Sequence, residues 1–574
     1  MAGIFGGVGL NNYTFKQKSI LSYDECFFND IMYGRKYINK FNGERFIIEN
    51  SEYIFVFEGF LFDIENFETQ QDFLENRINL KNIKNFLNEL DGIFSLFLYL
   101  KTEEKIILAG DHLASMKLFY SKVGDTFIFS SDLFDITAYY RETAKAMEID
   151  LDATYFFLGF GSIVSNKTLF QNINKLEPSS YLEFDIKLNQ ISVHKYATLN
   201  FEKDHTLLEN DIVDKYEELI SKAIDRIVNL HSRYNLEYLS GLSGGLDSKS
   251  MLIALHQKNI KKITTFTFAE YHSLDQKIAQ TVASKLGFIH NFIALDKGNC
   301  LQYNFESALK ASNGMVALHT LLHSYNSFIN INTNPFGLLL TGQIGDAIFG
   351  SHFIGEKSIK AYITSKSHYG KVPEFIYNKI GFMNELLDEY SHGNSEAYIY
   401  EGRISNGTMY GDIILRDSID SITPFYSKAL LDFTLTVPEE HRVGEEIYIK
   451  WLKKYHPKVL MFKWDKCDCK PTSKVKVQFL KYIYTIKNAI KKRMKLKYDG
   501  MNPFDVWYRE NLAILENLDT LYEENIDVLN FNTELKNDVV SLYHSDIDRY
   551  KRNKFVVVTL LLSLNLHING NING

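Results

Sequence analysis

The chain has 574 residues, of which 45% are hydrophobic and 23% are charged, so it is long enough for more than one domain and too apolar to stay disordered. Its 63 basic and 71 acidic side chains give a net charge of −8, which argues against nucleic acid as a main partner. The four cysteines are too few for a disulfide framework in a chain of this length and suit a reducing compartment.

The first part of the chain, residues 1–205, has the pattern of a strand-rich domain. Short alternating or apolar runs separated by turn residues predict strands at residues 53–57, 93–100 and 126–130. The boundary with a second domain is expected in the charged stretch at residues 200–211.

The second part, residues 206–574, changes to longer helical patterns that begin with residues 212–230. Strands and helices then alternate, which predicts an α/β domain with a doubly wound parallel sheet and a helical C-terminal part. After a first strand that ends at Leu239, the expected elements are strands at residues 262–269, 290–295 and 336–341 and a helix at residues 275–286.

The most informative stretch is Ser243-Gly244-Gly245-Leu246-Asp247-Ser248, which follows the first of these strands and precedes a helix expected over residues 249–258. A strand, a glycine turn and a helix form an anion site, because free N–H groups and the positive end of the helix dipole face the ligand. The two serines can add hydroxyl donors. The carboxylate of Asp247 would repel phosphate unless a cation, most simply Mg²⁺, lay between them. The alternative is a plain glycine turn that caps a helix, which is the usual explanation of a bare Gly-Gly pair.

The full hexapeptide S-G-G-x-D-S is the motif of pyrophosphatase-type ATP loops and differs from the G-x-x-x-x-G-K-[ST] loop of kinases and GTPases. Enzymes that carry it cleave ATP between the α and β phosphates, so that AMP is left on a substrate and pyrophosphate is released. ATP and Mg²⁺ are therefore the expected cofactors.

A second glycine turn, Gly342-Gln343-Ile344-Gly345-Asp346, follows the last expected strand. It would lie at the carboxyl edge of the parallel sheet, where ligands bind in this class of fold. Asp346 is thus a second candidate ligand for Mg²⁺. An exposed aspartate that caps a helix is the alternative.

The segments after residue 470 give no functional motif. The basic run between Lys487 and Lys497 has helical spacing and is interpreted as a solvated helix face. The apolar run at residues 555–566 is too short to span a membrane, and residues 1–10 have no charged region ahead of their apolar residues. We expect a cytoplasmic protein with no membrane partner. The protein could form a homodimer, but the sequence does not determine the oligomeric state.

At several motifs the sequence resembles the asparagine synthetase family, which includes the β-lactam synthetases and the lasso-peptide cyclases. The resemblance covers nearly the whole chain and implies an N-terminal-nucleophile amidohydrolase-like sandwich followed by an ATP-pyrophosphatase domain. The matching segments are Met1–Gly7, Leu90–Phe94, Asp111–Tyr120, Ser130–Asp132, Gly342–Gly350, Thr423–Phe425, Val437–Pro438 and Arg442.

The departures from the family pattern affect both halves. The family's cysteine nucleophile is replaced by Ala2, which has no thiol, and its glutamine-holding N-G-E has become Glu58-Gly59-Phe60. We therefore expect glutamine hydrolysis to be lost. In the other half G-E-G-x-D-E has lost both glutamates, to Gln343 and Ala347, which predicts a shift away from free aspartate as substrate.

The family also uses a lysine from a C-terminal loop to stabilise charge on the α phosphate. The corresponding loop is residues 462–471, and Pro471, aligned with the proline that follows this lysine in the family, favours Lys466. Lys463 and Lys470 are the other candidates, and a solvated surface lysine is the alternative for each.

The resemblance implies an AMP-forming amide ligase that adenylates a small-molecule or peptide carboxylate. The amine would be free ammonia, ammonia from a separate glutaminase, or an amine of the substrate itself. Because both glutamates after Gly342 are lost, a degenerate nucleotide-binding protein with a regulatory or scaffold role is a second hypothesis. A tRNA-modifying ATP-loop enzyme is a third, which the acidic balance and the unpaired cysteines oppose.

Overall fold

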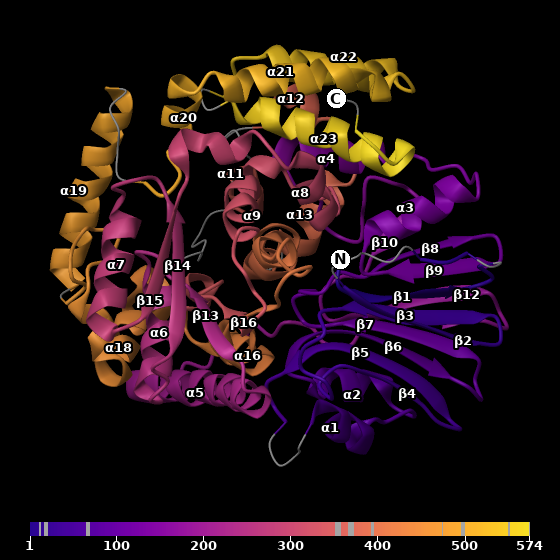
Figure 1. Ribbon diagram of the computed structural model, residues 1–574, viewed down its shortest axis with the longest axis horizontal. Helices are drawn as coiled ribbons and strands as arrows, with labels where there is room; N and C mark the ends of the chain where they lie inside the picture. Colours follow the sequence, from indigo (N-terminus) through magenta and orange to yellow (C-terminus); the bar gives the residue numbers. More distant parts are fainter. Residues whose placement is uncertain are drawn as a thin grey trace.

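The computed structural model describes residues 1–10, 13–15, 21–64, 69–350, 358–365, 372–391, 395–472, 474–494, 500–548 and 551–572. The strands of the first 200 residues gather on one side of the molecule (Figure 1). A parallel sheet with helices around it occupies the other side, and helices from the C-terminal part of the chain lie across the top.

Two six-stranded antiparallel sheets form the N-terminal half. The first sheet has the spatial order β10 (Ile173–Lys175), β8 (Phe119–Val123), β9 (Thr126–Ser130), β1 (Gly3–Val8), β3 (Ile31–Tyr37), β2 (Ser22–Phe28). The second has the order β12 (Gln190–Lys195), β11 (Ser180–Asp185), β7 (Lys105–Gly110), β6 (Gly92–Leu100), β5 (Tyr53–Leu61), β4 (Phe46–Glu49). The predicted strands at residues 53–57, 93–100 and 126–130 are confirmed as β5, β6 and β9.

The two sheets pack face to face through aromatic and aliphatic side chains. Phe97 of the second sheet stacks on Tyr33 and Phe129 of the first, with ring centroids 5.7 and 5.4 Å apart. The outer face of the second sheet is covered by α1 (Gln70–Arg77) and α2 (Ile83–Glu89), and α3 (Leu133–Glu142) packs on the first. Because both faces of β5 and β6 are buried, these strands have continuous apolar runs.

The second half is built on a parallel sheet. Its spatial order is β15 (Ile289–Ala294), β14 (Ile263–Ala269), β13 (Glu237–Gly241), β16 (Phe336–Leu340), β17 (Ser421–Ile422). Numbered along the chain this order is 3-2-1-4-5, so it reverses at β13. In open parallel sheets ligands bind at the carboxyl ends of the strands at such a reversal, which here lies between β13 and β16.

The helices that follow the strands have these bounds: α4 (Leu151–Phe160), α5 (Glu209–Tyr234), α6 (Leu246–Gln257), α7 (Leu274–Leu286), α8 (Phe305–Ala311), α9 (Leu322–Phe328), α10 (Gly345–Ile348), α11 (Ile359–Ser365), α12 (Glu374–Tyr377), α13 (Met383–Ser391), α14 (Ser395–Ala397), α15 (Tyr410–Ile413), α16 (Lys428–Thr436), α17 (Glu439–Arg442) and α18 (Glu446–Tyr455). A π-helix, η3, covers Tyr398–Thr408. The expected start of α6 at residue 249 is wrong, because Gly245 takes an extended conformation and serves as the N-cap.

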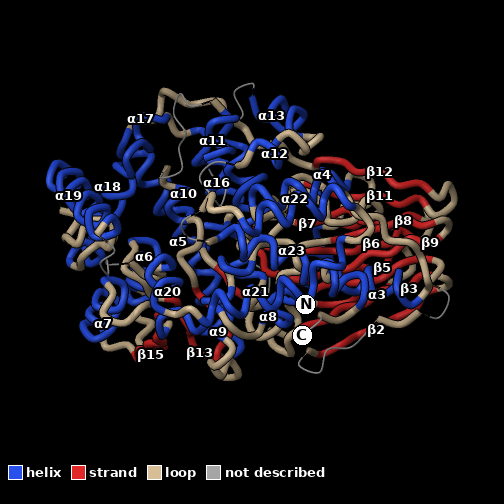
Figure 2. The backbone as a smooth tube through the Cα atoms, turned by 90° about the horizontal axis from the view of Figure 1, so that it is seen from above, coloured by secondary structure: helices blue, strands red, loops and turns tan. Residues whose placement is uncertain are grey.

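The last part of the chain is helical, as expected, with α19 (Lys474–Arg493), α20 (Phe504–Glu510), α21 (Ala513–Asn525), α22 (Thr533–His544) and α23 (Arg552–Asn569). The apolar run at residues 555–566 forms the buried part of α23, which packs against α3 and α4 on one side and α8, α21 and α22 on the other. Figure 2 shows α23 among these helices, beside the strands of the N-terminal half. Within the described residues no helix combines the length and hydropathy needed to cross a membrane.

Candidate active site

The phosphate-loop candidate lies where the strand order reverses. The chain leaves β13 at Gly241, turns through residues 242–245 and enters α6 at Leu246. Asp247 and Ser248 therefore sit in the first turn of the helix rather than in the turn before it. The loop is closed by its own serines, since the backbone N–H of Ser243 donates to Ser248 Oγ at 3.1 Å and that of Gly245 to Ser243 Oγ at 3.2 Å.

Two glycines allow neighbouring loops to approach this turn. A Cβ atom on Gly342, in the loop after β16, would lie 2.5 Å from the backbone nitrogen of Ser248. A Cβ atom on Gly244 would lie 2.7 Å from Cβ of Asp465, in the loop at residues 462–471. The three loops are thus in direct contact, and neither glycine can carry a side chain without displacing a neighbour.

Asp247 lies where these three loops meet. Its Oδ1 accepts a hydrogen bond of 2.7 Å from the hydroxyl of Tyr448, which lies on α18. Burial, followed by the charge of Asp346, raises the pKa of Asp247 to about 7. Two carboxylates that repel each other at the end of a phosphate loop form an arrangement that a divalent cation would relieve.

Lys466 lies beside the same two carboxylates. Its ammonium group donates to Oε1 of Glu445 at 2.7 Å, and Oε2 of Glu445 accepts from Lys481 of α19 at 2.8 Å. Burial disfavours its charged form, but Glu445, Asp346 and Asp247 together raise the pKa of Lys466. The lysine is therefore held protonated next to the candidate metal ligands.

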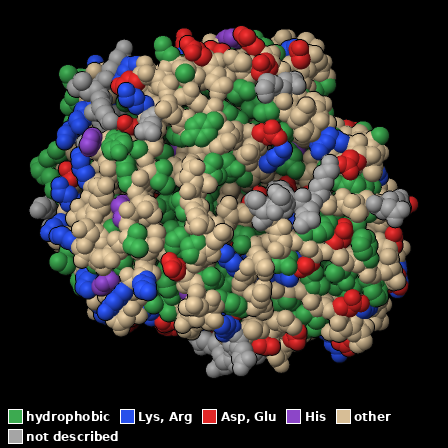
Figure 3. All heavy atoms as spheres, in the orientation of Figure 1, with side chains coloured by type: hydrophobic (Ala, Val, Ile, Leu, Met, Phe, Trp, Pro, Cys, Tyr) green, Lys and Arg blue, Asp and Glu red, His purple; other side chains and the backbone are tan. Residues whose placement is uncertain are grey.

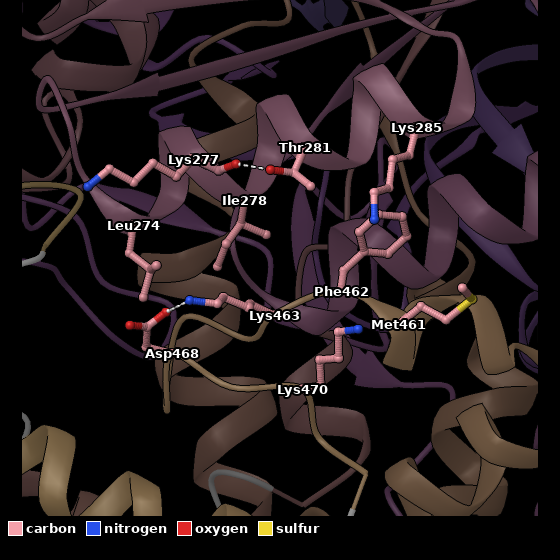
Figure 4. Close-up of a pocket in the computed structure, with 10 residues that line it drawn as sticks. All are labelled: Leu274, Lys277, Ile278, Thr281, Lys285, Met461, Phe462, Lys463, Asp468 and Lys470. Carbon is pink, nitrogen blue, oxygen red and sulfur yellow. Dashed lines mark hydrogen bonds and ion pairs between the residues drawn. The ribbon is translucent and has the colours of Figure 1, made fainter.

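The other two lysine candidates line a cavity of about 450 Å³ between α7 and the loop at residues 462–471 (Figure 4). The ammonium group of Lys463 is 2.8 Å from Asp468 in an exposed ion pair, and Lys470 also lines this cavity. Lys466 is not among the residues that line it. The loop thus directs these lysines to different places, and Lys466 is the one that lies beside Glu445.

Two buried side chains that the sequence analysis missed support the phosphate loop. Lys249 of α6 donates to the carbonyl oxygen of Gly244 at 3.0 Å, and burial lowers its pKa to about 8. Asp275, in the first turn of α7, accepts from the backbone N–H of Gly244 at 3.0 Å. Lys249 directly follows the hexapeptide, which was an available signal. Tyr448 and Glu445 had none, because no motif marks α18 or Glu445, the N-cap that precedes it, far along the chain.

A magnesium ion fits this site in the way it commonly binds ATP enzymes. Within the described part of the chain, no group of three or more His, Cys, Asp or Glu side chains could hold a metal ion on its own. Mg²⁺ is usually held by one or two carboxylates together with phosphate oxygens and water. Asp247 and Asp346 could supply such carboxylates, so the nucleotide would complete the coordination.

A second cavity, of about 460 Å³, opens beside the loop after β16. It lies between the N-terminal half and the helices α9 and η3, and its lining includes Phe156, Phe160, His323, Gln343, Tyr398 and Arg403. The side-chain amide of Gln343 donates to the carbonyl oxygen of Thr408 at 2.8 Å. Burial lowers the pKa of His323 to about 4, so its ring is neutral at pH 7. The cavity therefore combines aromatic surface with an amide and a single guanidinium group.

Two protein-family models match the chain in tandem. The glutamine amidotransferase domain matches residues 49–197 and the asparagine synthase domain matches residues 219–482. The chain belongs to the asparagine synthetase family. The resemblance inferred from the sequence motifs is thereby confirmed. The two matches also agree with an N-terminal domain built of sheets and a following domain with a parallel sheet and helices.

Curated relatives carry the same family name. Asparagine synthetase [glutamine-hydrolyzing] 2 of Bacillus subtilis (strain 168) is 22% identical over 46% of this chain and 37% of its own length. A putative asparagine synthetase [glutamine-hydrolyzing] 2 of Methanocaldococcus jannaschii is 26% identical over 34% of this chain and 36% of its own. The chain thus spans little more than a third of the length of these relatives.

Among solved structures, glutamine phosphoribosylpyrophosphate amidotransferase from B. subtilis is matched at 10% identity. The match covers 46% of this chain and 77% of that chain with a TM-score of 0.22. At this score the match supports no structural argument.

In this member of the asparagine synthetase family, charged side chains fill the region around Glu58. Arg45 Nε lies 3.5 Å from Oε2 of Glu58, Arg45 also pairs with Asp420, and its guanidinium lies 4.7 Å above the ring of Phe60. Arg35 approaches Oε1 of Glu58 at 3.4 Å. Although both arginines oppose it, burial raises the pKa of Glu58 to about 7. The positions expected to hold glutamine thus form a buried ionic cluster.

Two further residues of the N-terminal half contact the synthetase half. The carboxylate of Asp91 caps α16, where it accepts from Ser427 Oγ at 2.7 Å and from the backbone N–H of Lys428 at 2.6 Å. Ala2 is buried, and its N–H donates to Asp417 at 3.1 Å. These contacts join the two halves of the molecule.

Proposed function

We propose that this protein is an ATP-dependent amide-forming ligase that adenylates a carboxylate and releases AMP and pyrophosphate. The observation that carries the proposal is the meeting of three loops at the reversal of the parallel sheet. The hexapeptide loop, the loop with Asp346 and the loop with Lys466 contribute an anion site, two carboxylates and a cation to one place. Membership of the asparagine synthetase family supports the same reaction class.

The roles follow from position. The turn at residues 243–248 and the N-terminus of α6 would bind the pyrophosphate part of ATP. Asp247 and Asp346 would hold Mg²⁺, which when bound neutralises charge on the phosphate oxygens. Tyr448 orients Asp247 through their hydrogen bond. Lys466 would stabilise the charge that develops on the α phosphate during adenylation.

The proposed reaction has two steps. An oxygen of the substrate carboxylate attacks the α phosphorus of ATP, the bond to the oxygen that bridges the α and β phosphates breaks, and pyrophosphate leaves with that electron pair. An amine then attacks the activated carbonyl carbon, an amide forms, the amine loses a proton, and AMP leaves.

The cavity beside Gln343 is the proposed acceptor pocket. It adjoins the loop that carries Asp346, and its volume of about 460 Å³ is within the usual range for ligand pockets. Phe156, Phe160 and Tyr398 give it aromatic surface, which free aspartate would not use. We propose a larger carboxylate with a ring or an apolar part, in agreement with the loss of the family's glutamates.

We also propose that glutamine is not the nitrogen source. Ala2 offers no nucleophile, and the cluster of Arg45, Glu58 and Asp420 occupies the region where the family's motif would hold the amide. The amine would be free ammonia, ammonia from another glutaminase, or an amine of the substrate. We further propose that the boundary between the glutaminase-like domain and the synthetase domain lies between residues 205 and 206.

The test is ATP–pyrophosphate exchange with Mg²⁺ and a panel of carboxylates that includes aspartate, uronic acids, aromatic amino acids and peptides. Exchange that depends on one ring-containing or apolar carboxylate, with AMP as the nucleotide product, is the expected result. ADP as the product would reject the AMP-forming mechanism.

The alternative of a degenerate nucleotide-binding protein rests on the loss of both family glutamates after Gly342. In either case a phosphate would have to displace the protein oxygens that accept from the backbone N–H groups of Ser243, Gly244 and Gly245. ATP binding without exchange, for every carboxylate in the panel and with ammonia present, would support this alternative over the ligase.

A further inference from the structure

Helix α19 stands at the outer edge of the molecule in both views of the backbone (Figures 1 and 2). It covers Lys474–Arg493 and is connected to the proposed site through Lys481, which pairs with Glu445. The sequence analysis interpreted the basic run in this region as a solvated face, and Lys495 and Lys497 of that run lie outside the described residues.

The outer face of α19 is a stripe of large apolar side chains. They recur every three or four residues and are 40–67% exposed: Phe479, Tyr482, Ile483, Ile486 and Ile490. At 3.6 residues per turn they fall within an arc of about 100°. A contiguous exposed apolar surface of this kind marks an interaction site more often than isolated exposed residues do.

The charged side chains in residues 479–494 of α19 and the residue after it are all basic. Between Phe479 and Met494 the sequence contains no acidic residue. The cations of this stretch are Lys481, Lys487, Lys491, Lys492 and Arg493. Figure 3 shows blue and green side chains along the edge of the molecule where α19 lies in Figure 1. Because the whole chain carries a net charge of −8, this helix is a local exception.

The inner face of α19 is fixed to the protein. Leu480 and Tyr484 pack against the main hydrophobic core, and Lys481 pairs with Glu445 at 2.8 Å and lies 4.0 Å from the ring of Trp464. Only one side of the helix is therefore available to a partner. An apolar stripe flanked by cations, with no acidic residue in the segment, is the pattern of a helix that lies in the interface of an anionic membrane.

We propose that α19 binds an anionic lipid membrane surface, with its apolar stripe in the interfacial region and the exposed cations Lys487 and Arg493 near the headgroups. This mode needs no membrane-spanning helix, so it agrees with the absence of such a helix from the described residues. It does not agree with the expectation of no membrane partner, which rested on the lack of a span. The proposal is independent of the ligase reaction, because binding is measured without turnover.

The test is sedimentation of the full chain with vesicles made of equal parts phosphatidylglycerol and phosphatidylcholine, and with vesicles of phosphatidylcholine alone. We expect at least about tenfold more protein bound to the anionic vesicles, and most of that binding lost in about 0.5 M salt. The double variant Ile486→Asp/Ile490→Asp should remove binding, and Leu188→Asp/Ile289→Asp, at exposed apolar positions elsewhere, should not.

The charge contribution has its own matched pair. Lys487→Glu/Arg493→Glu should reduce binding at least about tenfold, while Lys81→Glu/Lys122→Glu, with the same change of net charge in the N-terminal half, should bind like wild type. Unchanged circular dichroism of each variant shows that its fold is retained. Equal binding by wild type and the Ile486 and Ile490 variant would overturn the proposal. The proposal would also be overturned if the protein associated with itself in the absence of lipid and the same variant abolished that association. The stripe would then be a contact between protein molecules.

Discussion

At the scale of single residues, the loop at residues 462–471 shows how three lysines close in sequence are separated in space. The backbone N–H of Trp464 donates to the carbonyl oxygen of Cys469 at 2.8 Å, which closes the loop into a tight turn. Lys463 and Lys470 lie on the side of α7, and Lys466 pairs with Glu445. Spacing alone could not separate them, because the direction of each side chain depends on how the loop folds back.

The first prediction concerns Lys466. Lys466→Ala should lower the adenylation rate by roughly 10²–10³, the usual loss when one donor to a transition state is removed, with little change in ATP affinity. Lys466→Arg should rescue poorly, because a planar guanidinium does not replace a compact ammonium charge. The measurement is carboxylate-dependent ATP–pyrophosphate exchange.

Lys463→Ala and Lys470→Ala are the controls for Lys466, and both should stay within about twofold of wild type. A large loss in either control with an active Lys466→Ala would mean that the loop was assigned incorrectly. Full activity of all three variants would favour the nucleotide-binding alternative.

The second prediction concerns the carboxylate pair. Asp247→Asn should reduce exchange by roughly 10² or more, because Mg²⁺ loses an anionic ligand and the phosphates lose charge stabilisation. Asp346→Asn should behave alike if Asp346 is also a ligand, whereas a helix-capping role would cost only about 1 kcal/mol of stability and no activity. Asp225→Asn on the surface of α5 is the control. Exchange by Asp247→Asn at the wild-type rate would remove this residue from the mechanism.

At the scale of elements, the parallel sheet was the most predictable part. The strands expected at residues 262–269 and 336–341 are β14 and β16, because the first is rich in β-branched and aromatic residues and the second is a short apolar run. The register and order of the N-terminal sheets were not predictable, since strands buried on both faces carry no alternation to show which face is which. The π-helix η3 and the ionic cluster at Glu58 depend on contacts between distant segments.

The third prediction uses the ionic cluster on β5. Burial raises the pKa of Glu58 from 4.5 to about 7, so between these values the folded protein retains a proton that the unfolded chain has lost. The stability contributed by this group is complete below about pH 4.5 and is lost as the pH rises through 7. The shift in the pKa of Glu58 corresponds to a change in the free energy of unfolding on the order of 3 kcal/mol at most. Glu58→Gln has no such proton, so its stability should fall less than that of wild type between pH 5 and 8.

The measurement for Glu58 is the midpoint of urea unfolding at several pH values. Glu89→Gln, an exposed position on α2, is the control and should follow wild type. Identical pH slopes for wild type and Glu58→Gln would contradict the raised pKa.

At the scale of the whole molecule, polar contacts tie the amidotransferase half to the synthetase half. Arg45 pairs with Asp420, Asp91 caps α16, and the ammonium group of Lys117 donates to Ser405. Helix α23 adds an apolar contact to both halves. Side chains of the N-terminal half thus hold the two halves together, which gives that half a structural role that does not depend on glutamine hydrolysis.

The last prediction tests whether that half could recover its family activity. If only the nucleophile were missing, Ala2→Cys would restore glutamine hydrolysis. We expect no release of glutamate above background, because Glu58 lies between Arg45 and Arg35 where the family's motif would hold the amide. The measurement is glutamate release from glutamine, with a glutamine-hydrolysing relative as the positive control.

Activity in Ala2→Cys alone would show that the cluster opens to admit glutamine and that the nucleophile is the sole loss. Inactivity of both Ala2→Cys and the triple variant Ala2→Cys/Glu58→Asn/Phe60→Glu would show that the nucleophile and the N-G-E positions are not the whole loss, since the triple variant leaves the pair of Arg45 with Asp420 in place.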